Sequence, residues 1–248
     1  MAYQAVNNMP ETIEDFRVYY GLSTQINNEH IIGRCWRPEL EGGERYIMKS
    51  KPGRFSTFNW LTDWLRLPTV PNALVAYRGR VYAFDEVNMY RIDPTMLRIE
   101  DIMEGVGCIS PNAITVTDYG MVFCDRNNIY LHDGQRAQPI GDPILRNTSG
   151  DNLEDINAAD NFHQDDGYQA LVKNAYDNPM WGKPRVWTSW SGQAGSFLVG
   201  VTSSLSGYKR TYIYAYKPQL QRWDKWRVYL DDDEITALFL GEDGECYF

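Results

Sequence analysis

Histidine, the side chain most often used for acid–base catalysis, is scarce in this sequence. Its three copies are His30, His132 and His163, and none lies beside a serine, cysteine or carboxylate in a known nucleophile motif. No catalytic triad can be assigned, and we expect the chain not to be an enzyme. Aspartate and glutamate are plentiful, so a pair of carboxylates facing each other across a cleft, as in glycoside hydrolases, stays open as an alternative.

The acidic run Asp231–Glu234 is the segment most similar to a metal-binding loop. Carboxylates at alternate positions can converge on a Ca²⁺ ion. The calcium-loop signature requires glycine at its sixth position, and here that position is Thr236. We therefore expect a solvated turn at this run, with no metal site and no cofactor.

Tryptophan is concentrated in one segment of the chain. Trp181, Trp187 and Trp190 lie within ten residues of each other. Trp187 and Trp190 are three positions apart, so on a strand they face opposite sides of the sheet and one ring can be exposed. An exposed Trp can stack on a sugar or anchor a protein interface, whereas a buried one fills the contact between two sheets. Both interpretations stay open.

Composition and charge limit the class of protein. The chain has 248 residues, 43% of them hydrophobic and 14% aromatic, with 17 Tyr, 9 Phe and 8 Trp. This supply of aromatic residues favours β-sheets over a helical bundle. The formal net charge of -9 argues against a surface that neutralises a nucleic-acid backbone, although DNA could pass an acidic wall without being held.

Cysteine usage and hydropathy indicate a protein made in a reducing compartment. Cys35, Cys108, Cys124 and Cys246 are widely separated and form no zinc-ligand pattern, so free and mostly buried thiols are expected. No basic and apolar signal peptide opens the chain, and no long apolar run predicts a membrane span.

The elements that must position these residues differ between the two ends of the chain. Residues 1–71 are expected to form an irregular N-terminal segment. It would contain two short helices, Glu11–Tyr20 and one capped by Ser56, and one strand, Arg45–Ser50.

An internal repeat begins in the remaining part of the chain, residues 72–248. Three segments recur at offsets of 40, 41 and 40 residues. The matching pairs are Asn72–Tyr77 with Asn112–Thr117, Gly79–Phe84 with Gly120–Asp125, and Asn88–Asp93 with Asn128–Asp133. Each unit contains four short strands, and a period of about 40 residues is typical of β-propeller blades.

A third unit follows a polar insertion at about 147–183, which includes a candidate helix, Leu153–Phe162. Its four strands are predicted at Val186–Trp190, Ser196–Val201, Tyr212–Tyr216 and Trp223–Val228, and a fourth unit begins with Ile235–Leu240 and Glu245–Phe248. The predicted fold class is all-β, with β-propeller-like repeats of four-stranded antiparallel blades and short helical insertions.

The amino-acid sequence of the second unit resembles that of a known family. The segments Glu104–Asp125, Asn128–Gly134 and Gln138–Ile144 are similar to the β-propeller proteins at the neck and tail of tailed bacteriophages, of the DNA-stabilisation or tail nozzle type. Members of that family attach below the portal and its adaptor. Their order of a glycine-rich link, a Tyr-containing strand, an Asp-Gly turn and a helical insertion resembles the order here.

The resemblance implies a structural virion component, part of the portal-proximal neck or tail nozzle through which DNA passes without specific binding during ejection. Its partners would be other virion proteins (portal, adaptor or tail proteins) and further copies of the chain in a homo-oligomeric ring, with no membrane. Its location would be the phage tail or neck, after assembly in the host cytoplasm. The last sheet leaves an unpaired edge, which we expect the Arg45–Ser50 strand or a neighbouring chain to cover. The alternative is a glycan- or receptor-binding β-propeller module that uses exposed Trp and Tyr rings.

Overall fold

The computed structural model describes residues 2–4, 17–35, 44–59, 62–145, 168, 172, 185–205, 208–227, 239–240 and 246–247. The chain divides into two compact units, Met1–Pro111 and Asn112–Phe248. Strands account for most of the described structure, and no helix within it has the length and apolar character needed to cross a lipid bilayer.

The first unit contains a strand pair and two larger sheets. The pair is β1 (Ala2–Gln4) with β2 (Arg17–Tyr19). The first large sheet has the order β3-β4-β5-β6, with β7 also paired to β5; its strands are β3 (Leu22–Ile26), β4 (Glu29–Cys35), β5 (Tyr46–Lys51), β6 (Arg54–Phe58) and β7 (Trp64–Arg66). The second has the order β11-β10-β9-β8; its strands are β8 (Ala73–Tyr77), β9 (Arg80–Phe84), β10 (Asn88–Asp93) and β11 (Arg98–Glu104).

The second unit contains two four-stranded sheets and a strand pair. The first sheet consists of β12 (Ile114–Thr117), β13 (Gly120–Cys124), β14 (Ile129–His132) and β15 (Ala137–Pro139), and a short helix follows it, α1 (Asp142–Leu145). The second consists of β16 (Arg185–Ser191), β17 (Ser196–Leu205), β18 (Tyr208–Lys217) and β19 (Arg222–Arg227). The pair is β20 (Phe239–Leu240) with β21 (Cys246–Tyr247).

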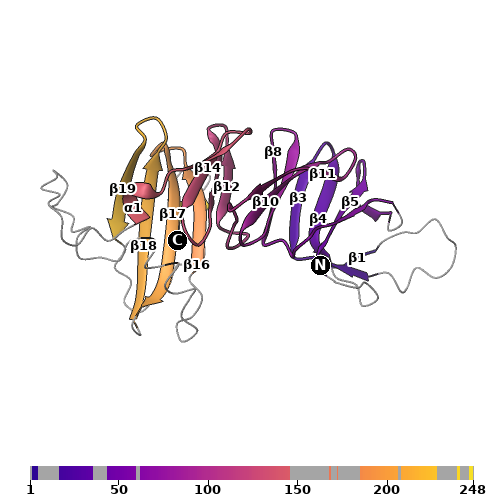
Figure 1. The fold of residues 1–248 in the computed structure, drawn as a ribbon, viewed down its shortest axis with the longest axis horizontal. Coiled ribbons are helices and arrows are strands. Elements are labelled where there is room, and N and C mark those ends of the chain that lie inside the picture. The colour runs from indigo at the N-terminus through magenta and orange to yellow at the C-terminus, as the bar shows by residue number, and fades with distance from the viewer. Residues whose placement is uncertain are drawn as a thin grey trace, which may run out of the picture. The chain divides into compact units, whose positions relative to one another are not determined.

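Every strand pairing in the described structure is antiparallel, and the four-stranded sheets follow the order of the sequence (Figure 1). Short hairpin turns join most neighbouring strands, as expected when each strand pairs with the next one in the chain. The prediction of an all-β fold built from four-stranded antiparallel sheets is therefore confirmed.

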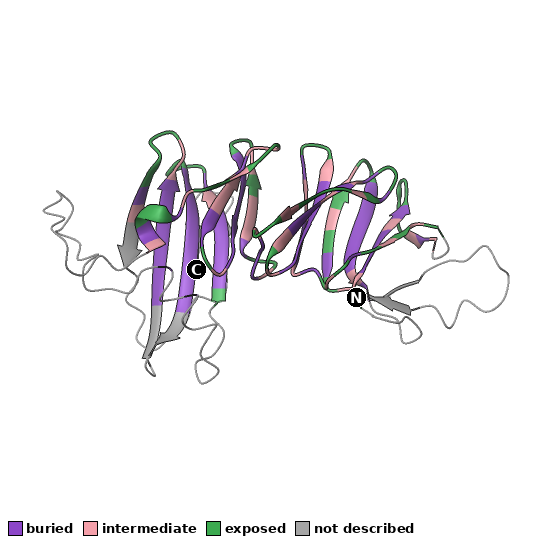
Figure 2. Cartoon of the chain, viewed as in Figure 1, coloured by how far each residue is buried: buried purple, intermediate pink, exposed green. Residues whose placement is uncertain are grey.

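The cores lie between the faces of neighbouring sheets. In the first unit, a buried cluster joins the sheet β3–β7 to the sheet β8–β11, and its members include Leu22, Ile31, Ile47, Leu74, Val81 and Ile92. The Oγ1 of Thr24 in β3 also accepts a hydrogen bond of 3.1 Å from the amide of Ala76 in β8. Middle strands such as β9 and β13 are buried along most of their length, whereas β11 is mostly exposed (Figure 2).

The repeat is real, but its alignment differs by one residue from the predicted one. Tyr77 pairs with Arg80, and Thr117 pairs with Gly120, so Gly120 is equivalent to Arg80 and not to Gly79. Val81 and Val122 are both buried on strands, as expected, but they lie on opposite faces of their sheets because a shift of one residue exchanges the faces. The shift arises because Gly79 ends a turn, whereas Gly120 is the first residue of β13.

Residues 1–71 are not irregular, because most of the described part forms the sheet β3–β7. The helix expected from Ser56 is absent: Ser56 lies in β6, and the predicted helix end lies in β7. Pro52 and Gly53 instead form a tight turn between β5 and β6. The chain therefore reverses direction and continues as a strand that pairs with β5, not as a helix. The end of the other expected helix, Glu11–Tyr20, is the strand β2, and its beginning lies outside the described residues.

The Arg45–Ser50 strand is confirmed as β5, but its expected role in covering a distant edge is wrong. β5 pairs with β4 along one side and with β6 and β7 along the other. Both edges are therefore occupied within its own sheet. The insertion at 147–183 with its candidate helix, apart from Tyr168 and Val172, and the run Asp231–Glu234 lie outside the described residues.

Candidate functional site

A row of four aromatic side chains crosses the sheet β16–β19 near one end. Each stands directly opposite the next in the ladder, in the order Trp190, Phe197, Tyr216 and Trp223. The ring centroids of Trp190 and Phe197 are 4.7 Å apart, and those of Tyr216 and Trp223 are 5.0 Å apart. Cross-strand aromatic pairs stabilise a sheet, so this row fixes the register of the four strands.

Tyr119 extends the row from the neighbouring sheet of the same unit. It lies in the turn between β12 and β13, and its ring centroid is 5.0 Å from that of Trp190, with the planes tilted by 38°. The amide of Tyr119 donates to Thr117 Oγ1 at 3.2 Å, which holds the turn. Tyr119 is 47% exposed, while Trp190 beside it is half-buried.

Gln219 fixes the outer edge of Tyr119. This residue lies in the turn between β18 and β19, and its Nε2 donates to the Tyr119 hydroxyl at 3.2 Å. The turn itself is closed by a hydrogen bond of 3.1 Å from the Leu220 amide to the Lys217 carbonyl. Tyr119, Trp190 and Gln219 together form what we call the aromatic surface.

A third turn, between β16 and β17, leaves Trp190 accessible. Its residues are Gly192, Gln193, Ala194 and Gly195, all exposed and mostly without bulky side chains. A Cβ atom at Gly192 would lie 3.8 Å from the Trp190 Nε1, so the turn runs beside the indole N–H edge. The residues beside the Trp190 edge of the aromatic surface are therefore mostly small and exposed.

The opposite end of the row is an anchor and not a binding surface. Trp223 is 9% exposed, and its Nε1 donates a hydrogen bond of 2.6 Å to the Ile140 carbonyl, which follows β15. The row thus contacts the sheet β12–β15 at both ends, through Tyr119 and through Ile140. This double attachment holds the exposed rings in place.

The predicted tryptophan contacts are only partly brought together. Trp187 is buried at 6% exposure on the face of β16 opposite Trp190, so it fills a core position. Trp181 lies outside the described residues. Sequence reasoning missed Tyr119 and Gln219, which are a hundred residues apart in the chain. The usable signal was Tyr119 itself, because an aromatic residue in a tight hairpin turn has little to pack against locally.

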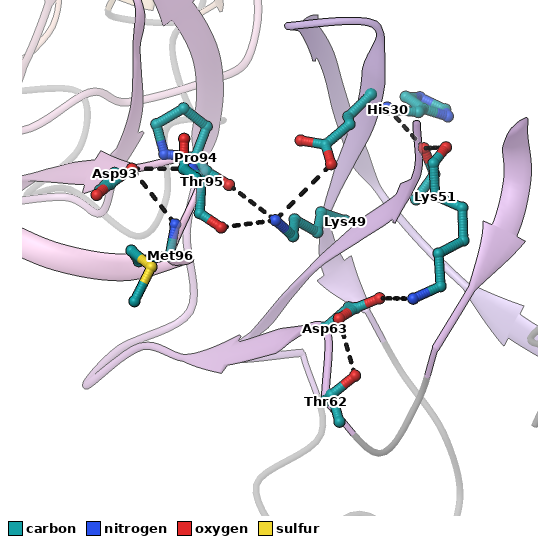
Figure 3. Close-up of polar contacts among 11 residues, drawn as sticks. His30, Lys49, Lys51, Thr62, Asp63, Asp93, Pro94, Thr95 and Met96 are labelled. Atoms are coloured by element: carbon teal, nitrogen blue, oxygen red, sulfur yellow. Dashed lines mark hydrogen bonds and ion pairs between the residues drawn. The ribbon is translucent and has the colours of Figure 1, made fainter. Parts of the chain in front are cut away.

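Lys49 is the centre of a polar cluster in the first unit (Figure 3). Its Nζ donates to the Thr95 carbonyl at 2.7 Å and the Pro94 carbonyl at 3.2 Å, and it lies 3.7 Å from Glu29 Oε1. The three protons of the ammonium group are thereby matched by three acceptors. Lys49 clamps β5 to the turn between β10 and β11, which is a structural role.

Asp85 is the most thoroughly hydrogen-bonded carboxylate described in the first unit. It accepts hydrogen bonds from the amides of Val87 and Asn88, from the Asn88 side chain and from the hydroxyls of Tyr90 and Thr69. Burial raises the pKa of Asp85, but these hydrogen bonds, led by that from Thr69, outweigh burial, and the pKa lies below its ordinary value. An ionised, saturated carboxylate has no proton to donate as a general acid at neutral pH.

Asp125 holds the equivalent turn in the next sheet of the sequence. Its Oδ1 accepts from the amides of Asn127 and Asn128, each at 2.6 Å. The pKa of Tyr130 is raised by burial first and then by the charge of Asp125. Among the described residues, no group of three or more His, Cys, Asp or Glu side chains is placed to hold a metal ion.

These observations define the described chain as an all-β protein of four- and five-stranded antiparallel sheets, with the aromatic surface in its second unit. Neither a protein-family model nor a curated protein matches its sequence. The fold is similar to a solved structure of the extracellular domain of BT4673 from B. thetaiotaomicron, with a TM-score of 0.54 and 10% identity over 96% of this chain and 26% of that one.

Two further structures show weaker likeness. A second structure of the BT4673 extracellular domain has a TM-score of 0.48 and 10% identity, over 96% of this chain and 25% of that one. The protein BF0058 from Bacteroides fragilis has a TM-score of 0.42 and 11% identity, over 89% and 61% of the two chains. This chain spans about a quarter of the length of the BT4673 structures.

The resemblance to phage neck and tail proteins is wrong, and the virion function expected from it is wrong too. The similar structure with a TM-score above 0.5 is a bacterial extracellular domain, and no family model of phage proteins matches the chain. The motifs behind the resemblance have local causes. Asp133 accepts hydrogen bonds from the amides of Gln135 and Arg136, and a side chain at Gly107 would collide with the Glu86 backbone. Such turns recur in unrelated sheets.

The expected partners and the expected virion location were inferred from that resemblance, so it no longer supports them. A homo-oligomeric ring stays a prediction, which sedimentation over a wide range of concentrations tests.

Proposed function

We propose that the chain is a glycan-binding module of the β-propeller type, and that it acts by binding and not by catalysis. The observation that carries this proposal is the aromatic surface. The Tyr119 ring packs on Trp190 and is held by Gln219, yet it is 47% exposed, so part of its surface is available to a ligand. The extracellular location of the BT4673 domain is a supporting parallel, since such domains meet ligands from outside the cell.

The propeller arrangement is supported by how the first strands of successive sheets meet. β3 packs against β8 in the first unit, and β12 packs against β16 in the second. In a propeller, the first strand of each blade lies next to the first strands of its neighbours around the centre. The Thr24–Ala76 hydrogen bond, and that of 2.8 Å between the hydroxyls of Thr115 and Thr188, link such strands.

The chemistry of the aromatic surface suits a sugar. One face of a pyranose ring carries C–H groups, which pack on an aromatic ring and remove apolar area from water. The hydroxyl groups at the edge of the sugar need hydrogen-bond partners. Gln219 provides a carbonyl oxygen and a second N–H beyond the one used on Tyr119.

Affinity electrophoresis in native gels that contain a panel of soluble polysaccharides tests the proposal. We expect at least one polysaccharide to retard the chain, and Tyr119→Ala to abolish the retardation. Trp190→Ala should weaken it at least tenfold, because Tyr119 loses its support. Trp64→Ala is the matched control: Trp64 is 42% exposed and packs on Tyr46 at 5.4 Å, but it lies in the first unit. Retardation by no polysaccharide, or retardation lost in Trp64→Ala but not in Tyr119→Ala, would contradict the proposal.

A further inference from the structure

The hairpin turn that carries Gln219 is flanked by two cations. Lys217 ends β18, Arg222 begins β19, and the two residues stand directly opposite each other. Like charges at such positions repel each other unless an anion lies between them. Asp224 is that anion: Oδ1 accepts from Arg222 Nε at 2.9 Å and Nη2 at 2.6 Å, and Oδ2 lies 3.7 Å from Lys217 Nζ. One carboxylate faces two cations, so the cluster keeps an excess positive charge.

Both cations are accessible, and both are tied to the aromatic surface through the turn. The side chains of Lys217 and Arg222 are 36% and 58% exposed. Lys217 is two residues from Gln219, at most about 7 Å along the backbone. Lys217 and Arg222 come next to the Tyr216–Trp223 pair in the ladder, so they project from the face opposite the aromatic row. A ligand that contacts Tyr119 and these cations must cross the turn.

The direction of the hydrogen bond at Tyr119 gives an independent observation. Gln219 Nε2 is the donor, so the phenolic proton of Tyr119 is not used in this bond and is available to a ligand. A hydroxyl that already accepts a hydrogen bond is polarised and donates more strongly. The strongest partners for such a donor are the oxygens of a carboxylate or a sulfate.

We propose that the ligand of the aromatic surface is an acidic oligosaccharide of at least two sugar residues, which carries carboxylate or sulfate groups. This inference rests on the proposed function. One sugar packs on Tyr119 and accepts its phenolic proton, while an anionic group across the turn binds Lys217 and Arg222. The net charge of -9 does not prevent this at physiological ionic strength, because exposed charges farther away than about 8 Å are largely screened.

Two acidic polysaccharides and their neutral counterparts test the inference and separate the two sources of charge. The carboxylate pair is polygalacturonate with its methyl ester, and the sulfate pair is κ-carrageenan with agarose. Neutral galactan and xylan complete the panel. We expect an acidic chain to bind the wild-type protein at least tenfold more tightly than its neutral counterpart, and the pair that shows this difference identifies the anionic group. A monosaccharide, free galacturonic acid, should compete only weakly.

Charge variants distinguish a binding role from a structural one. Lys217→Gln with Arg222→Gln should weaken binding of the acidic chain about tenfold or more and leave the fold intact. Asp224→Asn should strengthen it about threefold, because the competing carboxylate is removed. A purely structural cluster would lose stability in both variants and leave the affinity for the acidic chain unchanged in both. Arg98→Gln is the matched control, since Arg98 is an exposed cation of the first unit.

The outcomes separate this inference from the proposed function. Binding of neutral galactan or xylan that needs Tyr119, with no preference for an acidic chain, overturns the acidic ligand and keeps the glycan-binding module. Acidic binding that Lys217→Gln with Arg222→Gln leaves unchanged also overturns the inference. No binding to any chain of the panel overturns both.

Discussion

Asp85 and Asp125 hold the same turn in two sheets, forty positions apart in the sequence, each by accepting the amides two and three residues ahead. Asn88 and Asn128 keep the same spacing from their aspartates, as do Tyr90 and Tyr130. The repeat is therefore one of hydrogen-bonded turns as well as of strands.

Replacing Asp85 by Asn should lower the free energy of unfolding at neutral pH by about 2 kcal/mol, because buried donors lose a charged acceptor. The pKa of Asp85 is lowered in the folded chain, so its stabilisation is present above the pKa of the unfolded chain, about 4, and is lost as the pH falls through the folded value. Urea unfolding at pH 7 and at pH 3 checks this. The gap between variant and wild type should shrink at pH 3, and a gap that widens there would contradict the assignment.

Lys49 and Lys51 lie on the same strand, but we expect them to contribute differently to the free energy of unfolding. Lys49→Met should cost about 2 kcal/mol of stability, because it leaves Glu29 and two carbonyls without their cation. Lys51→Met should cost less than about 0.5 kcal/mol, since the Lys51 side chain is 46% exposed and water can replace its single ion pair with Asp63. Urea denaturation of both variants gives the comparison. Equal losses would show that the Lys49 cluster is not a clamp.

Val122→Asp places a charge in a fully buried position of β13 and should cost about 3 kcal/mol or more. Val116→Asp, on the neighbouring strand β12, should cost less than about 1 kcal/mol because that side chain is 37% exposed. Thermal unfolding followed by circular dichroism measures both. A tolerated Val122→Asp would mean that β13 is not a core strand.

Gly120→Ala should destabilise the turn that presents Tyr119. The backbone of Gly120 has φ of 153°, and a Cβ there would lie 2.6 Å from the Leu131 side chain. Gly79→Ala separates strain from collision, because Gly79 also has a positive φ but nothing lies within 4 Å of its Cβ position. We expect about 1 kcal/mol of lost stability for Gly79→Ala and a larger loss for Gly120→Ala. Only Gly120→Ala should also weaken retardation by a polysaccharide.

The sequence predicted the sheets β8–β11, β12–β15 and β16–β19 because alternation and turn residues are local signals. The alignment of Gly79 with Gly120 was wrong by one residue, because Gly79 ends a turn in one unit whereas Gly120 begins a strand in the other. Apart from β5, the strands of the sheet β3–β7 were missed, because this part of the sequence does not resemble the repeat. Trp190 was found as a candidate, whereas Tyr119 and Gln219 were not, because their contact joins two turns that only the packed fold brings together.

The hydrogen-bonded turns at Asp85 and Asp125 have a consequence for how such a chain can evolve. Duplication of one forty-residue segment copies the strands together with the carboxylate, the asparagine and the tyrosine at their turn, so a new sheet carries the residues that close its own turn. The β17–β18 connection has no aspartate in that place, and the aromatic row instead ties that sheet to its neighbour. A copy of the sheet β16–β19 alone would lack the contacts with Tyr119 and with the Ile140 carbonyl, because both residues belong to the segment that forms the neighbouring sheet β12–β15.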